Sequence, residues 1–155
     1  GANYLDSYNY IPILLYANSW NVLIGLIGGI YVAKKQSKAI ANTTMASAII
    51  NILINLLLVK FIGLYAASIS TLLSYLIMGI YRYFDCKKYV NIKIDFKTFS
   101  AFSIVFIISS LLYYSNNIYL NLVNLLFVII YSLIINKKYI FKAINFFKIK
   151  IVKRL

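Results

Sequence analysis

The sequence predicts an all-α protein, a polytopic transmembrane helical bundle of about five spans, from its composition and the placement of its charges. Hydrophobic residues make up 63% of the 155 residues and charged residues 12%, whereas soluble domains are about half apolar and about a quarter charged. The mean hydropathy is +0.83. The net charge of +13 comes from 16 basic and three acidic residues, which lie almost entirely between apolar runs. This pattern favours a membrane surface over nucleic acid as the partner.

The first span is predicted over residues 9–33 and carries small and polar residues at helical spacing. Asn18, Asn21, Gly25 and Gly28 follow at helical spacing and share one face of this helix. Gly25 and Gly29 form a small-xxx-small pair, which lets another helix approach closely. We therefore expect these glycines to serve helix packing rather than to form a hinge.

The second and third spans are predicted over residues 39–59 and 64–83. The four residues between them allow only a tight antiparallel hairpin, with Gly63 in the turn and Ala67 at the helix contact. Polar groups in these apolar runs need partners inside the protein, because the hydrocarbon core holds no water. The expected inward polar face of the hairpin comprises Thr43, Ser47, Asn51, Asn55, Ser70, Thr71 and Ser74.

Two interpretations of this polar face, taken together with Asn18 and Asn21, are open. In the first, the groups are interhelical hydrogen-bonding pairs, each contributing about 0.6 kcal/mol. In the second, they line a wet cavity with Trp20 and Tyr75 as aromatic platforms for a hydroxyl-rich cargo. We prefer interhelical pairing, and the cavity wall is the alternative.

The fourth and fifth spans are predicted over residues 98–114 and 118–136. The remaining residues, 137–155, contain seven basic residues and no acidic one. Apolar residues recur there at helical spacing, which is typical of an amphipathic helix lying at the membrane surface with its lysines among anionic headgroups. We expect this tail to be cytoplasmic.

The loop charges predict an orientation. If alternate loops face the same side, 15 of the 16 basic residues share that side and Lys60 alone is opposite. By the positive-inside rule this side is the cytoplasm, so the N-terminal end faces the exterior. Because the chain begins with Gly1 and Ala2 rather than Met, we expect it to be a fragment. The surface-facing basic loops hold Lys34, Lys35 and Lys38, then Arg82, Lys87, Lys88, Lys93 and Lys97, and finally Lys137 and Lys138 at the start of the tail.

No catalytic or metal-binding pattern is present in the sequence. The chain has no histidine and one cysteine, Cys86, so Cys/His metal sites and His-activated nucleophiles are excluded. The three carboxylates, Asp6, Asp85 and Asp95, are predicted in loops, and no charged residue is expected inside a span. We therefore expect no enzyme activity, metal or cofactor, and no acid for ion coupling within these helices.

The hairpin carries a family resemblance. The runs IINILINLLL (49–58) and IGLYAASISTLLSY (62–75) resemble the C-terminal half of polysaccharide flippases, the O-antigen and capsule exporters of the MOP (multidrug/oligosaccharidyl-lipid/polysaccharide) superfamily. Residues 31–38 and the loop at Lys87 and Lys88 are also similar. Tyr65 departs from the pattern, because the family commonly has a second glycine there.

The resemblance implies the second lobe of a two-lobed, MATE-like transporter. Such a protein flips undecaprenyl-linked oligosaccharide across the bacterial cytoplasmic membrane for surface polysaccharide biosynthesis. The implied partners are the lipid bilayer, this cargo and the missing N-terminal lobe, with no nucleic acid. Basic cavity residues of the family meet the cargo diphosphate, a role that falls here to the missing lobe. The alternatives are a multidrug or peptidoglycan-precursor exporter of the same superfamily and a non-transporting membrane docking module.

Overall fold

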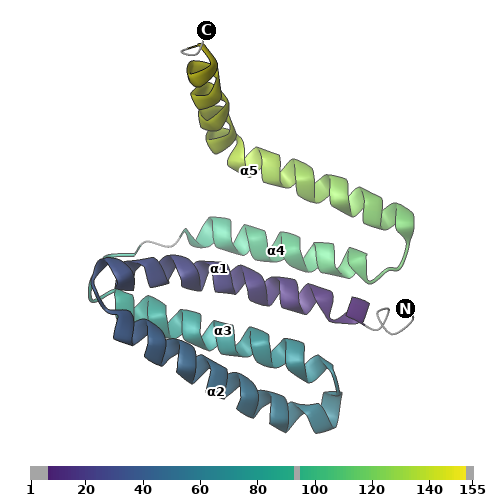
Figure 1. Cartoon of the computed structure of the whole chain (residues 1–155). Helices are drawn as coiled ribbons and strands as arrows, with labels where there is room; N and C mark the ends of the chain where they lie inside the picture. Colours follow the sequence, from purple (N-terminus) through teal and green to yellow (C-terminus); the bar gives the residue numbers. More distant parts are fainter. Residues whose placement is uncertain (1–6, 93–94, 153–155) are drawn as a thin grey trace. The chain divides into compact units, whose positions relative to one another are not determined.

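The computed structural model describes residues 7–92 and 95–152, less the side chains of residues 96, 143, 144 and 146–152, and this part of the chain consists of helices joined by short turns and loops. No strand occurs in that part, which confirms the predicted all-α class. The helices in chain order are α1 (Ile11–Ala33), α2 (Ser37–Ile62), α3 (Tyr65–Cys86), α4 (Phe96–Tyr113) and α5 (Ile118–Val152) (Figure 1).

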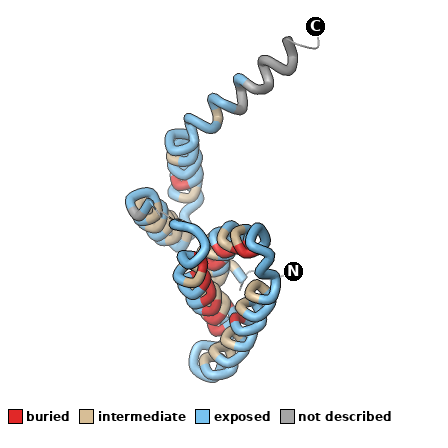
Figure 2. Tube along the Cα trace, turned by 90° about the vertical axis from the view of Figure 1, so that its left-hand side faces the viewer, coloured by how far each residue is buried: buried red, intermediate tan, exposed pale blue. Residues whose placement is uncertain are grey.

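The chain divides into two units, a three-helix unit within residues 1–95 and a helical hairpin within residues 96–155. In the three-helix unit, α3 packs extensively against both α1 and α2, while α1 and α2 touch only briefly. Buried residues, red in Figure 2, gather where the helices of this unit face one another. The central position of α3 makes it the helix that organises this unit.

The inner face of α3 is built from small residues at intervals of four. The buried residues Ala66, Ser70 and Ser74 follow one line along the helix, which the larger Met78 continues. Small side chains such as alanine and serine let helix backbones approach closely. Next to this line, Gly79 has the closest neighbours of the described glycines. A Cβ atom on Gly79 would lie 3.4 Å from both Ile24 and Trp20 of α1.

The glycine contacts differ from those predicted. No atom lies within 4 Å of a Cβ built on Gly25 or Gly29, so neither brings another described helix close. The face of α1 that packs on α3 is instead the buried line Ala17, Ile24, Gly28 and Tyr31. The adjacent Gly28 and Gly29 point about 100° apart around the helix, and of the two only Gly28 is on the buried line.

Gly63 acts through its backbone. It ends α2 with φ +55° and ψ −133°, a conformation that L side chains rarely adopt, and nothing lies within 4 Å of its Cβ position. Gly63 therefore serves the predicted turn through its backbone conformation, and no side-chain packing is seen at its Cβ position among the described residues. Ala67, the other residue predicted at this contact, is exposed, and its neighbours Ala66 and Ser68 are buried.

Among the described residues, three helices are long and apolar enough to cross a membrane: α1, α2 and the segment Ile118–Lys142 of α5. Their outer surfaces are apolar, with large exposed side chains such as Ile49, Leu53 and Leu57 on α2. This arrangement, polar inside and apolar outside, indicates a membrane protein. α3 is not one of these three helices, and its inner face is rich in hydroxyl groups, which lower its mean hydropathy. The apolar part of α4, Lys97–Tyr113, is shorter than any of them.

Helix α5 continues past the predicted end of the fifth span at residue 136, without interruption to Val152. Figure 1 shows that the helix bends where its colour passes from green to olive, toward the C-terminal basic segment. The predicted division between a span and a separate tail therefore does not coincide with a helix end. Residues 153–155 of that tail lie outside the described residues.

Candidate functional site

A buried arginine joins α2 and α3. Arg82, on α3, is only 4% exposed. Its Nε donates a hydrogen bond to Thr43 Oγ1 at 2.9 Å. Its Nη2 donates to the carbonyl oxygen of Ile40 at 3.2 Å and to Thr44 Oγ1 at 2.8 Å. On the α1 side the guanidinium lies next to Gly28, where a Cβ would be 3.6 Å from Nη1, an ordinary contact distance.

The burial of Arg82 corrects the sequence analysis, which placed it in a loop and expected no charge inside a span. Arg82 continues the inner line of α3, four residues after Met78 and four before Cys86, and all three are buried. Within the described chain its charge has no carboxylate partner, because the ion pair found there joins Lys88 to Asp85. Neutral oxygens of α2 therefore solvate the guanidinium in place of water. In the sequence, the four-residue intervals from Met78 to Arg82 and from Arg82 to Cys86 indicate that Arg82 lies on this inner line.

A second polar connection joins α1 to the end of α3. The hydroxyl of Tyr31, a fully buried side chain, donates to Asp85 Oδ2 at 2.8 Å. The exposed ammonium of Lys88 donates to Asp85 Oδ1 at 2.7 Å. This bond raises the pKa of Lys88 above its ordinary value. Asp85 was predicted in a loop, but it lies in the last turn of α3, where one oxygen can face inward and the other outward.

Hydroxyl and amide groups continue the contact between α2 and α3. Ser47 Oγ, buried, donates to the carbonyl oxygen of Ser74 at 3.2 Å. Asn51 Nδ2 reaches Thr71 Oγ1 at 3.5 Å, a long contact. Ser70, Thr71 and Ser74 also donate to carbonyl oxygens of their own helix. These hydrogen bonds satisfy polar groups between two apolar helices, as interhelical pairing requires.

The remaining predicted site residues lie apart from this contact. Asn55 is half-buried. Asn18 and Asn21 are exposed on α1, away from its packed face. The basic residues predicted at the membrane surface are exposed: Lys34, Lys35, Lys38, Lys87, Lys88, Lys137 and Lys138.

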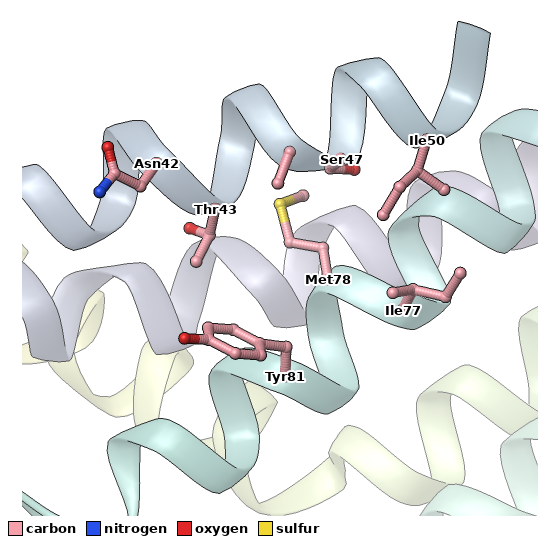
Figure 3. A pocket seen from close by; sticks show the side chains of 8 residues that line it. Asn42, Thr43, Ser47, Ile50, Ile77, Met78 and Tyr81 are labelled. Atoms are coloured by element: carbon pink, nitrogen blue, oxygen red, sulfur yellow. The ribbon is translucent and has the colours of Figure 1, made fainter. Parts of the chain in front are cut away.

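A groove of about 360 Å³ runs along the outside of the α2–α3 contact (Figure 3). Of the predicted polar face, only Thr43 and Ser47 line it. Their hydroxyls bond within the protein, and the rest of the groove is mainly apolar. The lining residues are Asn42, Thr43, Ala46, Ser47 and Ile50 from α2 and Ile77, Met78 and Tyr81 from α3.

The hairpin of α4 and α5 holds polar groups of another kind. Asn124, 9% exposed, donates from Nδ2 to the carbonyl oxygen of Ser109 at 3.0 Å. Its Oδ1, the Oδ1 of Asn121 and the hydroxyl of Tyr131 are buried without a hydrogen-bond partner among the described residues. Asn117 accepts from the backbone N–H of Tyr119 at 2.9 Å and so caps the start of α5.

The described residues contain no group of three or more histidine, cysteine, aspartate or glutamate side chains that would hold a metal ion. Comparison of the sequence with protein-family models, and of the chain with curated proteins and solved structures, found no match. Function therefore has to be argued from the residues themselves.

Proposed function

We propose that this chain is part of a membrane transporter that moves undecaprenyl-linked oligosaccharide from the cytoplasmic to the outer leaflet of a bacterial cytoplasmic membrane. The observation that carries the proposal is the hydrogen-bonded polar contact between α2 and α3. It lies in the segment whose sequence resembles the polysaccharide flippases. Ser47, Asn51 and Arg82 contribute to this contact from within helices whose outer faces are apolar.

The hydrogen bonds favour a scaffolding role for these five helices in the transporter. Arg82 is held by Thr43 and Thr44 and closed in by Gly28, so its donors stabilise the three-helix unit rather than meet a cargo phosphate. The cargo diphosphate is then bound by basic residues of the other lobe, and the three-helix unit is part of the structural framework of the lobe opposite.

A clean deletion of the complete gene tests this function. We expect lipid-linked oligosaccharide to accumulate in the cytoplasmic leaflet and surface polysaccharide to be lost. Reaction of the glycan with a membrane-impermeant oxidising reagent, compared between intact spheroplasts and inverted vesicles, measures the leaflet. Reintroduction of the intact gene is the control, and it should restore the outer-leaflet signal.

Other outcomes separate the alternatives. Normal surface polysaccharide in the deletion strain contradicts the proposal. Normal polysaccharide with increased drug sensitivity identifies a multidrug exporter, and cell lysis with accumulated peptidoglycan precursor identifies a precursor exporter. Loss of a membrane complex with unchanged transport identifies a docking module.

A further inference from the structure

The groove between α2 and α3 changes in polarity from one end to the other. Asn42 and Tyr81 lie at one end, and Ile50 and Ile77 lie at the other (Figure 3). Met78 lies between them. Asn42 is near the start of α2 and Tyr81 near the end of α3, so the polar end coincides with the end of the unit that carries Lys34 and its neighbouring lysines. The polarity changes along the direction in which the helices cross a membrane.

Two of the polar side chains that line the groove, Asn42 and Tyr81, are available to hydrogen-bond an occupant. The Thr43 hydroxyl accepts from Arg82 and donates to its own helix, and Ser47 donates to Ser74. In contrast, the amide of Asn42 and the hydroxyl of Tyr81, a residue 58% exposed, make no hydrogen bond to any described residue. The groove therefore offers an amide and a hydroxyl at one end and an apolar surface beyond them.

Positive charge lies just beyond the polar end. Lys38, Asn42, Ala46 and Ile50 follow one another at intervals of four, so Lys38 is one turn from Asn42 on the same face of α2. On α3 the exposed Lys88 follows Tyr81 and lines a neighbouring hollow with it. The nearby acid, Asp85, accepts from both Tyr31 and Lys88.

We propose that this groove binds one anionic glycerophospholipid. Its phosphate lies among Lys38, Asn42 and Tyr81, and one acyl chain runs along Ala46 toward Ile50. The distance from Asn42 to Ile50 along α2 is about 12 Å, close to the roughly 15 Å depth of one leaflet. The polarity, charge and length of the groove thus match those of a single lipid in its own leaflet. This binding does not depend on transport of any cargo.

An extended peptide segment fits the groove poorly. It brings unpaired backbone groups, and the apolar floor at Ile50, Ile77 and Met78 offers them no partner. An acyl chain brings no such groups.

Native mass spectrometry of the complete protein in mild detergent tests the proposal, with phosphatidylglycerol and phosphatidylcholine of identical acyl chains as probes. We expect one phosphatidylglycerol to be retained per chain, at least ten-fold more than phosphatidylcholine. In Ala46→Phe the ring fills the groove and should lower retention at least ten-fold. The matched control is Ala48→Phe, exposed on α2 and outside the groove, which should retain lipid as the unchanged protein does.

Two further variants test the headgroup end. Lys38→Gln should reduce the preference for phosphatidylglycerol to about one-fold, while Lys60→Gln, at the opposite end of α2, should leave it unchanged. If Ala46→Phe does not fold, the double variant Asn42→Leu/Tyr81→Phe takes its place, with a several-fold loss expected. Equal retention in Ala46→Phe and Ala48→Phe, or equal retention of the two lipids by the unchanged protein, overturns the proposal.

Discussion

The three-helix unit and the α4–α5 hairpin bury polar groups in opposite ways. Between α1, α2 and α3, even the charged side chain of Arg82 is hydrogen-bonded, and no buried side-chain nitrogen or oxygen of the described residues in this unit is unpaired. In the hairpin, Asn121, Asn124 and Tyr131 each leave a buried oxygen unpaired. Two helices enclose fewer partners than three, so polar groups at a two-helix contact have fewer donors within reach.

The difference shows which contacts specify the fold. A buried polar group left without a partner costs about 1–3 kcal/mol, while a typical satisfied hydrogen bond contributes about 1 kcal/mol. We therefore expect substitutions at paired groups of the three-helix unit to be costly. Substitutions at unpaired groups of the hairpin should be nearly neutral or stabilising.

Among the variants, Arg82→Ala should have the largest effect, because it removes the buried charge of the three-helix unit. It removes three hydrogen bonds to α2 and leaves a cavity between the helices, so we expect a loss of about 3 kcal/mol in the free energy of unfolding. Trp20 fluorescence during denaturation measures it, because this single tryptophan of the chain packs beside Gly79.

The apolar variant Arg82→Met separates charge from volume. Replacing a buried charged group by an apolar one of similar size is often neutral or stabilising, so Arg82→Met should recover most of the loss. The surface variant Lys88→Ala should leave the unfolding curve unchanged. Equal destabilisation by Arg82→Ala and Lys88→Ala is incompatible with a structural role for the buried guanidinium.

Gly79→Leu should cost about 2 kcal/mol, because overpacked contacts force neighbouring side chains out of their rotamers. Its Cβ would lie 3.4 Å from Ile24 and Trp20. The matched substitution Gly25→Leu, with no atom within 4 Å, should not lower the midpoint of the same denaturation curve. A larger loss from Gly25→Leu than from Gly79→Leu would mean that the packed face of α1 has been assigned wrongly.

Tyr31→Phe should lower the free energy of unfolding by about 1.5 kcal/mol, the value of a hydrogen bond to a charged group. It removes the bond to Asp85 and leaves the ring in place. Tyr81→Phe is the control, because its hydroxyl makes no hydrogen bond to a described residue. Identical unfolding curves for the two variants would show that the Tyr31–Asp85 bond contributes nothing measurable.

The smallest effects are expected in the hairpin. Asn124→Leu loses the bond to Ser109 and should cost no more than about 0.6 kcal/mol, the average for interhelical bonds in membranes. Asn121→Leu removes an unpaired oxygen and should slow amide exchange in α4 and α5. Hydrogen-exchange mass spectrometry measures both. Faster exchange in Asn121→Leu would indicate that this amide has a partner after all.

Sequence patterns located the helices well, but they did not identify which face of α1 packs against its neighbour. The tight turn at Gly63 followed from the short spacing between two apolar runs, and α2 and α3 lie on either side of it. On α1, Gly25, Gly28 and Gly29 were equally small, so spacing alone did not distinguish the face that packs. Arg82 was assigned to a loop because a charge near the end of an apolar run usually marks the membrane boundary.

The helical class and the approximate location of the helices follow from the amino-acid sequence, because apolar runs of this length in this composition are stable only as helices in a bilayer. Which side chains meet is a property of the packed helices. The pairing of Arg82 with Thr43 and Thr44, the bond from Tyr31 to Asp85 and the groove beside Tyr81 depend on the rotation of each helix about its axis. That rotation is chosen by side-chain packing between helices far apart in sequence, which no local pattern contains.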